Sequence, residues 1–513
     1  MRIADLLWHN ERQQPARVAL RIDGQPRSWH ELAEGVRATA AHLSAFVSPG
    51  DRVGLWFHNG YAWVECFLAL NALGAVCVPI NTRLTGQELR QIFGIAQLHA
   101  LVTTPLYRGR RYTEEARAVL QDCGARVHLL EAHDASPPGE WRHEVLNAKE
   151  QPYPGGGTPA DVFCIQYTSG TTAVPKGVML TDAAYIATAA YVARCQRLTP
   201  SSRFASAAPF FHCSGSMHAL TVCLLAGCTL HSMSVWDPQR YLDTVAEYGC
   251  DVSHMVYYRD VLALPAQARA RERLASMQVT HDLGTPDFLR RIHDELGIGG
   301  VSNLYGMTET CGQFTMWFPD DPLEQRITGN GRPQAGNEVR IADPDTGNEV
   351  ARGETGEIQM RGFTVSPGYF RNPGAQAAAF TADGWFRSGD LGRIGDDGQL
   401  VYVARLKEMI RVGGENLAPA EVEQALRDVC GVGAVCVLGV PDPRLDEVPA
   451  AVLVRPATQD WPAAMAQLRQ RLAGFKLPRA VYVADELPMT ATNRVQRATL
   501  QAWIRDNRLQ RVV

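Results

Sequence analysis

The sequence predicts an α/β fold of more than one domain, with mostly parallel sheets in a large N-terminal part. A chain of 513 residues is longer than one hydrophobic core normally organises. Apolar runs of four to eight residues alternate with longer segments of helical periodicity, as in sheets covered by helices. The composition, 46% hydrophobic and 20% charged, is that of a globular protein. We therefore expect stacked sheets with helices, followed by smaller subdomains.

The first elements follow from this alternation. Short apolar segments at 51–59, 74–81 and 99–104 predict strands. The segments 29–43 and 61–73 have helical periodicity and are predicted to be helices. Strands and helices in this order favour parallel pairing within one sheet.

The middle of the chain continues the pattern. Asp182 is predicted to cap a helix that runs through Ala183 to about Gln196. The segment 286–296 predicts a helix closed by Gly297, and a strand is expected to begin at about Val301.

The amino-acid composition changes at about residue 330. Gly and Asp become frequent between short β-like pieces, which indicates a β-rich subdomain at about 330–403. The last part shows helix, strand, strand, helix and strand in order. We therefore expect an N-terminal core at 1–404 and a small, mobile α+β domain at 405–513, with a hinge at Lys407.

Bulk properties exclude several classes of protein. A net charge of −4 gives no general attraction to nucleic acid or to an anionic membrane. The first twenty residues contain no apolar stretch long enough for a signal peptide, so we expect none, and no apolar run of membrane-spanning length occurs in the sequence. Twelve cysteines stand singly, most of them in apolar surroundings, which favours buried thiols in a reducing cytoplasm over disulfides or zinc sites.

The stretch QYTSGTTAVPKGVML, residues 166–180, has the composition of an anion-binding loop. Seven of the nine residues from Thr168 to Lys176 are hydroxyl, glycine, proline or lysine residues. Gly170 lets backbone N–H groups turn inward, the hydroxyls add small donors, and Lys176 adds a positive charge. The spacing is not that of a Walker loop. The loop therefore predicts a site for a phosphate chain, and a plain surface turn is the alternative.

Four further stretches place polar groups in apolar or glycine-rich surroundings. They are FFHCSG, LYGMTET, WFRSGDLG and TNRVQR, which contain His212, Tyr305 to Glu309, Asp390 and Arg494. Taken singly, each also fits a structural role: a satisfied core histidine, a strand end, an Asx turn or a solvated helix face.

Together these motifs resemble one family. The chain is similar to the adenylate-forming (ANL) superfamily of acyl-CoA synthetases, peptide-synthetase adenylation domains and firefly luciferase. The similarity runs nearly end to end, from GDRVGLWFHN through YTSGTTAVPKGV, YGMTET, GETGEIQMRG and ARLKEMIRVGGEN to LPMTATNRVQR. The first loop and YGMTE are its most specific parts.

The resemblance implies an enzyme that joins a carboxylate to the α-phosphate of ATP, releases pyrophosphate and transfers the acyl group. It implies a catalytic set of Lys176, Thr308, Glu309, Arg494 and the hinge Lys407, with Glu309 binding Mg²⁺. It implies nucleotide binding by Thr168, Ser169, Gly170, Thr171, Thr172, Gly284, Thr285, Pro286, Asn303, Tyr305, Gly306, Asp390 and Arg405. In this set Tyr305 stacks on adenine, Asp390 accepts from the ribose hydroxyls and Arg405 donates to ribose or phosphate.

Four positions depart from the family's pattern. The family usually has glycine at Ala173 and histidine at Asp182. It has Gly-Lys at Asn493 and Arg494, where the lysine bridges the carboxylate and the α-phosphate. The last change therefore bears on catalysis.

The acid and the acceptor are less constrained. Amino-acid-activating relatives carry an aspartate at His212, so we expect an aryl or alkyl acid in a pocket lined by His212, Tyr257 and Tyr258. Gly413, Gly414 and Glu415 resemble the wall of a pantetheine channel, which favours coenzyme A. The alternatives are an amide ligase similar to coronafacate ligase, the loading of a carrier protein, and an adenylate-binding protein without chemistry. A homodimer is a further expectation.

Overall fold

The structure is a computed structural model that describes most of the chain. It describes residues 1–84, 86–134, 136–151, 161–168, 175–254, 257–266, 271–412, 415–417, 419–456, 460–489 and 495–513. At Gln87, Arg411, Glu415, Asn416 and Asp446 only the backbone is described. Within these ranges, no helix is both long and apolar enough to cross a membrane.

Contacts within the chain divide it into two units. Unit 1 contains Met1–Val339, Met360–Phe386 and Asp397–Leu400. Unit 2 contains Arg340–Gln359, Arg387–Asp396 and Val401–Val513. The boundary at 404/405 and the hinge at Lys407 remain predictions, and each unit is described by itself.

The first sheet of unit 1 has seven strands in the order β7-β6-β5-β3-β4-β8-β9. Its strands are β3 (Arg52–Trp56), β4 (Val76–Pro79), β5 (Ala100–Thr103), β6 (Val127–Glu131), β7 (Arg142–Leu146), β8 (Val162–Thr168) and β9 (Lys176–Thr181). The central pairs are parallel, and the edge strands β7 and β9 pair antiparallel to their neighbours. β3, β4 and β5 are buried along their whole length, as expected for parallel strands covered on both faces.

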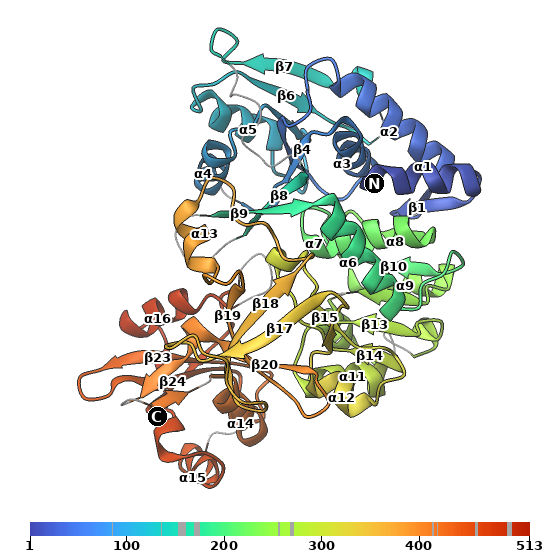
Figure 1. The fold of residues 1–513 in the computed structure, drawn as a ribbon. Coiled ribbons are helices and arrows are strands. Elements are labelled where there is room, and N and C mark those ends of the chain that lie inside the picture. Colours follow the sequence, from blue (N-terminus) through green and yellow to red (C-terminus); the bar gives the residue numbers. More distant parts are fainter. Residues whose placement is uncertain are drawn as a thin grey trace. The chain divides into compact units, whose positions relative to one another are not determined.

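Helices cover both faces of this sheet. They are α1 (Ile3–Gln13), α2 (Trp29–Leu43), α3 (Tyr61–Leu73), α4 (Gly86–Ala96) and α5 (Tyr112–Gln121). Figure 1 shows α2 and α3 on one side of the strands and α4 and α5 on the other. The Ser28 side chain caps α2 and accepts from the Glu31 N–H, and Gly74 ends α3 with a left-handed φ of 72°.

The second sheet of unit 1 also has seven strands, in the order β14-β13-β12-β10-β11-β1-β2. They are β1 (Val18–Ile22), β2 (Gln25–Ser28), β10 (Arg203–Ala205), β11 (Thr229–Ser232), β12 (Val252–His254), β13 (Val279–His281) and β14 (Gly300–Ser302). All but β2 pair in parallel. The carboxyl ends of β12, β13 and β14 therefore meet at one edge of the sheet, where ligands bind in such folds.

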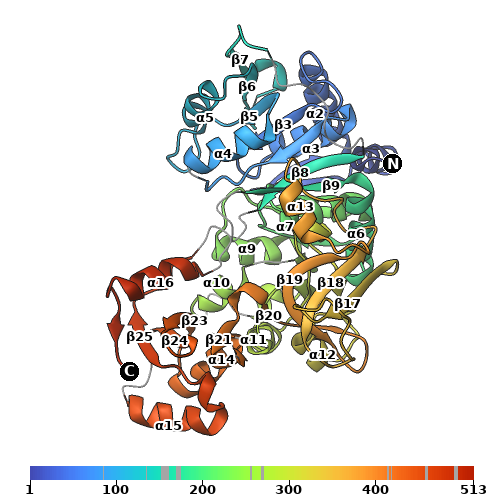
Figure 2. The same ribbon diagram turned by 60° about the vertical axis from the view of Figure 1, so that its left-hand side comes forward.

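The remaining helices of unit 1 follow in chain order. They are α6 (Asp182–Cys195), α7 (Cys213–Gly215), the π-helix η2 (Ser216–Thr221), α8 (Val222–Ala226), α9 (Pro238–Tyr248), α10 (Tyr258–Ala263), α11 (Pro286–Leu296), α12 (Leu323–Thr328) and α13 (Pro373–Ala379). Single 3₁₀ turns are η1 (Pro138–Glu140), η3 (Arg271–Leu274) and η4 (Thr308–Thr310). The short strands β15 (Thr315–Met316) and β16 (Arg332–Pro333) pair antiparallel. Figure 2 shows α6, α7 and α13 beside β8 and β9.

A four-stranded sheet, β17-β18-β19-β20, contains residues of both units. Its strands are β17 (Asn337–Ala342), β18 (Gly356–Gly362), β19 (Phe386–Ile394) and β20 (Leu400–Arg405). This is the β-rich stretch that the sequence predicts at about 330–403.

The rest of unit 2 is a six-stranded sheet with helices. Its strands are β21 (Ile410–Val412), β22 (Glu415–Leu417), β23 (Ala434–Asp442), β24 (Asp446–Val454), β25 (Ala480–Ala484) and β26 (Gln510–Arg511). Its helices are η5 (Leu406–Glu408), α14 (Pro419–Cys430), α15 (Trp461–Arg471), η6 (Gly474–Lys476) and α16 (Arg497–Arg505). β23 and β24 pair antiparallel, and β25 pairs in parallel with β24.

The predicted α/β fold class is confirmed. The helices predicted at 29–43 and 61–73 coincide with α2 and α3, and Gly297 ends α11 with a φ of 77°. All twelve cysteines are free thiols, and all except Cys123 are buried.

The predicted cap of α6 is wrong. Thr181 is the N-cap residue, and its hydroxyl accepts from the Ala184 N–H at 3.1 Å. Asp182 is the first helical residue, and its carboxylate accepts from the Ile3 N–H at 3.0 Å and from Asn71 Nδ2 at 2.7 Å. Asp182 therefore binds the first residue of α1 and a side chain of α3. A local capping pattern does not reveal such long-range hydrogen bonds.

Candidate active site

The ends of the predicted phosphate loop are fixed by the β8–β9 hairpin. Thr168 and Lys176 face each other in register, and Thr168 Oγ1 donates to the Lys176 carbonyl at 3.5 Å. Val162 to Gln166 form a buried run that anchors the hairpin. The predicted residues Ser169, Gly170, Thr171 and Thr172 lie outside the described residues.

Lys176 and Glu309 converge on Tyr369. Lys176 Nζ lies 5.1 Å from the centre of the Tyr369 ring, a cation–π distance. The Tyr369 hydroxyl donates to Glu309 Oε1 at 2.8 Å, and the Ser366 N–H donates to the Glu309 carbonyl at 2.7 Å. Burial and the nearby Glu309 carboxylate raise the pKa of Tyr369, so its hydroxyl remains a proton donor. Tyr369 thus contacts both the lysine, through its ring, and the carboxylate, through its hydroxyl.

Sequence reasoning missed Tyr369 and Ser366. Their signal is the run SPGY that follows β18, in which Gly368 has a positive φ of 132°. The backbone of this turn pairs with β9, because the Met179 N–H donates to the Gly368 carbonyl at 2.9 Å. The Ser-Pro-Gly-Tyr run could therefore have indicated a tight turn next to the phosphate-loop hairpin, and with it a site residue.

Thr308 and Glu309 lie on a tight turn, η4. The Met307 N–H donates to Thr310 Oγ1 at 3.1 Å, and the Gly312 N–H donates to the Met307 carbonyl at 2.7 Å. Cys311 and Gly312 have positive φ values of 56° and 83°. A Cβ on Gly306 would lie 2.6 Å from Gln313 Cα, so this position accepts only glycine. The turn therefore presents Thr308 and Glu309 with little freedom.

The residues predicted to bind adenine also come together. Asn303 Nδ2 donates to the Gly284 carbonyl at 3.0 Å. Thr285 caps α11 and accepts from the Phe288 N–H at 3.4 Å, with Pro286 at the first helical position. Tyr305, which is 5% exposed, pairs with Thr315 in an isolated β-bridge. Gly284, Asn303 and Tyr305 thus line one edge, at the ends of β13 and β14.

A buried carboxyl group, Asp282, lies at the same strand end. Asp282 Oδ1 accepts from the Leu283 N–H at 2.7 Å. Burial raises the pKa of Asp282 to about 8, and Arg259 and backbone donors oppose this shift only partly. The group is therefore mostly protonated at neutral pH.

The stability of the protein should fall with rising pH because of Asp282. Its folded-state pKa lies above its unfolded value, so its contribution is fully present below about pH 4 and is lost as pH rises toward about 8. The expected slope is at most about 1.4 kcal/mol per pH unit. Thermal unfolding of the wild type and of Asp282→Asn at pH 5 and pH 8 measures it, and the wild type should lose more. Equal losses in the two proteins would contradict the shift.

The structure gives the surroundings of the three residues predicted to line the acid pocket, and that role stays a prediction for His212 and Tyr257. The His212 ring caps α7, where Nδ1 accepts from the Ser214 N–H at 3.2 Å and lies 2.8 Å from Ser214 Oγ. Tyr258 is fully buried, and its hydroxyl is 2.8 Å from Ser253 Oγ and 3.2 Å from the Tyr241 hydroxyl. Because the Tyr258 hydroxyl is already bound, we assign Tyr258 to the core. Tyr257 is half-buried against Trp236, with ring centres 5.3 Å apart.

In unit 2 the two predicted ribose ligands form an ion pair. Arg405 Nε lies 3.0 Å from Asp390 Oδ1, and the Asp390 side chain is 4% exposed. Glu357, also buried, accepts from the Gly389 N–H at 3.2 Å and pairs with Arg387 at 2.9 Å. The glycine turn before Asp390 is therefore fixed from two sides.

For the other predicted residues of unit 2, the described part of the chain gives no side-chain contacts that bear on their roles. Gly413, Gly414 and Arg494 lie outside the described residues, and Glu415 is described only as the first residue of β22. Lys407 lies in the exposed turn η5.

Comparison with known proteins defines the class. The model of the AMP-binding enzyme family matches residues 7–370, and that of the AMP-binding enzyme C-terminal domain matches residues 421–494. The chain belongs to the family of AMP-binding enzymes. The resemblance to adenylate-forming enzymes is thereby confirmed.

Individual relatives are CoA ligases. The chain is 34% identical over 509 residues to a methyl-dioxo-octahydroindenyl-propanoyl:CoA ligase of Mycobacterium tuberculosis, with 96% of each protein covered. It is 35% identical to a feruloyl-CoA synthase of Amycolatopsis sp., covering 94% of this chain and 95% of that protein. The crystal structure of ATP-bound MatB from Rhodopseudomonas palustris matches with a TM-score of 0.86 and 28% identity, over 99% of this chain and all of that one.

Proposed function

We propose that this protein activates a carboxylic acid with ATP and transfers the acyl group to coenzyme A. The acid's carboxylate attacks the α-phosphorus and pyrophosphate leaves. The CoA thiol then attacks the acyl carbon, forms the thioester and displaces AMP. The observation that carries this proposal is the convergence of Lys176, Tyr369 and Glu309 beside the β8–β9 hairpin, in a chain of the AMP-binding enzyme family.

The described residues fit a triphosphate with a metal ion. Lys176 supplies a positive charge at the end of the hairpin, as a phosphate chain requires. Glu309 Oε1 accepts from Tyr369, and Oε2 has no protein donor in the described ranges. One carboxylate together with substrate phosphates is a usual Mg²⁺ environment, and the ion would neutralise phosphate charge.

The remaining nucleotide contacts are proposed from the places that these residues occupy in the family's motifs. Thr308 would donate to the α-phosphate from η4, and Tyr305 and Asn303 would bind adenine next to Gly284. Asp390 would accept from the ribose hydroxyls, and it is held in place by its ion pair with Arg405. Arg494 would bridge the carboxylate and the α-phosphate through its planar, permanently charged fork.

We favour an aryl or alicyclic acid over an α-amino acid. His212 stands where an amine-binding aspartate would be needed, and its Nδ1 already serves the α7 backbone. Two relatives are named for feruloyl and fused-ring propanoyl groups, which supports a bulky, uncharged acyl group.

CoA is favoured as acceptor because both relatives are CoA ligases, and an amine or a carrier protein is the alternative. Twelve free thiols support a reducing compartment such as the cytoplasm.

A panel assay tests the proposal. The protein is incubated with ATP, Mg²⁺ and single acids, then with CoA or with amines, and products are identified by mass spectrometry. Pyrophosphate release followed by an acyl-CoA is the expected result. Acyl-amides without acyl-CoA would make the protein an amide ligase. Nucleotide binding without turnover of any acid would overturn the proposal.

The hinge at Lys407 gives a separate prediction. Proline at 407 fixes φ near −65°, so a rotation about this residue would be blocked. Lys407→Pro should slow one half-reaction by about a hundredfold, as expected for misplaced catalytic groups, and affect the other much less. Lys407→Ala removes the charge but keeps φ free, and it is the matched control. Pyrophosphate release without CoA and thioester formation from isolated acyl-adenylate are measured separately. Equal losses in both steps would contradict the hinge.

A further inference from the structure

Three fully buried histidines form a cluster next to the candidate active site. His218 lies on the π-helix η2, His254 ends β12 and His281 ends β13. Their exposed fractions are 1%, 0% and 0%. The ring centres of His218 and His254 are 4.4 Å apart, and those of His254 and His281 are 5.8 Å apart. His254 and His281 thus lie at the carboxyl ends of neighbouring parallel strands, and His218 packs against His254 from η2.

Gln196 fixes the protonation of two of these rings. Its amide Nε2 donates to the Ser253 carbonyl at 3.2 Å, which sets the orientation of the amide because a carbonyl can only accept. The same Nε2 lies 3.1 Å from His281 Nδ1 and 3.4 Å from His254 Nδ1. An amide NH2 group has two hydrogens: one goes to the Ser253 carbonyl, and the other faces both Nδ1 atoms and lies nearer to that of His281. A hydrogen on either Nδ1 would point at this donor, so the neutral rings carry their hydrogen on Nε2.

These Nε2–H groups have no matching acceptor. Within the described ranges, His254 Nε2, His281 Nε2 and both ring nitrogens of His218 make no hydrogen bond. The backbone of Cys311 near His218 and that of Trp317 near His281 partly oppose the lowering of the pKa of these two rings, whereas His254 has no such backbone neighbour among the described residues. Buried donors without partners are costly, and a group of them in one place needs an explanation.

The cluster directly contacts the turn that carries Glu309. A Cβ on Gly312 would lie 2.8 Å from His218 Cε1 and 2.9 Å from Nε2, so the ring packs on this backbone. Gly312 comes three residues after Glu309 and shares hydrogen bonds with Met307. A π-helix such as η2 is an uncommon element that often marks a functional site. An acid whose carboxylate reacts beside Glu309 would extend toward these rings.

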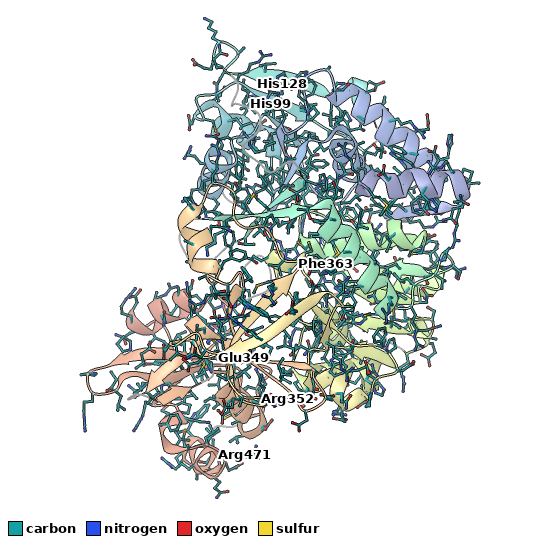
Figure 3. All side chains as sticks on the ribbon, in the orientation of Figure 1. His99, His128, Glu349, Arg352, Phe363 and Arg471 are labelled. Atoms are coloured by element: carbon teal, nitrogen blue, oxygen red, sulfur yellow. The ribbon has the colours of Figure 1, made fainter. Side chains whose placement is uncertain are left out.

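Another histidine cluster in the protein differs in this respect. His128 and His143 are hydrogen-bonded to each other at 3.0 Å, from His128 Nδ1 to His143 Nε2, and His99 stacks nearby. Figure 3 shows His99 and His128 in the N-terminal part, among the strands of the first sheet. His128 and His143 therefore form a hydrogen bond with each other, whereas no hydrogen bond joins His218, His254 and His281 to one another in the described ranges.

We propose that His218, His254 and His281 form the far wall of the acid pocket and bind a neutral, hydrogen-bond-accepting oxygen of the acid, such as a ketone, hydroxyl or ether. This inference rests on the proposed acid-activating function and extends it to the class of acid.

The charge state of the rings supports a neutral partner. Burial lowers the pKa of His218 to about 3 and that of His281 to about 4, and it lowers the pKa of His254 well below the usual value. All three are therefore neutral at physiological pH and offer N–H donors without positive charge. A second carboxylate on the acid would be buried without a counter-ion, so dicarboxylic acids are excluded from this wall.

Matched acids test the proposal on the wild type. Aryl and fused-ring acids are paired so that one member carries a methoxy or ketone oxygen and the other an ethyl or methylene isostere. Pyrophosphate release gives kcat/KM for each acid. In at least one pair the oxygen-bearing acid should be preferred by roughly tenfold to a hundredfold. Equal or better use of every hydrocarbon isostere would overturn the proposal.

A variant with a matched control locates the preference. His254→Phe should remove most of the oxygen preference in kcat/KM and leave the hydrocarbon acid nearly unchanged, and His254→Gln, which keeps an N–H donor, should restore part of it. His231→Phe is the control, because His231 is also buried and neutral, with a pKa lowered to about 4, but stacks on Tyr248 instead. An unchanged ratio in a folded His254→Phe protein would assign the rings a purely structural role and overturn the proposal. If His254→Phe does not fold, the wild-type pairs alone decide.

The two proposals fail in different ways. If no acid releases pyrophosphate, the proposed function fails and takes this inference with it. If hydrocarbon acids are activated and oxygen gives no advantage, only the histidine wall is wrong.

Discussion

Glu309→Gln should lower the rate of acyl-adenylate formation by about two to three orders of magnitude, since loss of one charge that stabilises the transition state has effects of this size. Glutamine keeps the shape of the side chain and can still accept from the Tyr369 hydroxyl at Oε1. It loses the negative charge that would bind Mg²⁺ and balance Lys176. Pyrophosphate release with acid and ATP, in the absence of CoA, measures the step.

The fold should tolerate this change. Glu309 is half-buried, and the Ser366 N–H contacts its backbone carbonyl, which the substitution retains. The melting temperature without ATP should therefore stay close to that of the wild type. Tyr369→Phe is the companion variant, because it keeps the ring below Lys176 and removes only the hydroxyl. We expect about a tenfold loss, as for one hydrogen bond to a charged group. A Glu309→Gln protein that is unfolded or fully active would contradict the assignment.

The main elements of the fold could be predicted from local patterns. α2 and α3 have helical periodicity with end signals in the sequence, a Ser28 cap and Gly74 respectively, so their bounds follow from the sequence. Asp182 shows the limit of such reasoning. It has a capping residue's chemistry, but its partners are Ile3 and Asn71, far away in the sequence. A short polar residue before a helix does not reveal which of its neighbours in space will bind it.

In the candidate site, too, some residues could be predicted from local motifs and others could not. Lys176, Glu309, Asn303 and Gly284 stand in motifs; the structure places Lys176 and Glu309 against Tyr369 and Asn303 against Gly284, and the roles of these residues stay predictions. Tyr369 and the histidine cluster were not predicted. His218, His254 and His281 lie in apolar segments and are separated by up to 63 residues, so only the parallel register of β12 and β13 brings two of them side by side. Pocket chemistry depends on such long-range neighbours.

Gly306→Ala should disable the enzyme through the addition of one methyl group, without adding or removing a charge. A Cβ at this position would lie 2.6 Å from Gln313 Cα and 2.7 Å from Gln313 N, both backbone atoms that cannot rotate away. The segment from Tyr305 to Gly312 must open to admit it. Overpacking of this kind costs about 1–3 kcal/mol of stability. It also shifts Thr308 and Glu309, and a shift of about 1 Å in a catalytic group typically costs about a hundredfold in rate.

Gly374→Ala is the matched control for this prediction. Gly374 lies exposed in the first turn of α13, a Cβ there meets no atom within 4 Å, and its φ is not positive. The same chemical change should leave activity unchanged and hold or slightly raise the melting temperature, because alanine favours helix. Thermal unfolding and pyrophosphate release are measured for both variants. Gly306→Ala should lose activity even at temperatures where it is fully folded, since the displaced turn carries the reacting groups. If it keeps wild-type kcat and KM for ATP, the tight turn does not position Glu309, and the site must depend on the phosphate-loop hairpin instead.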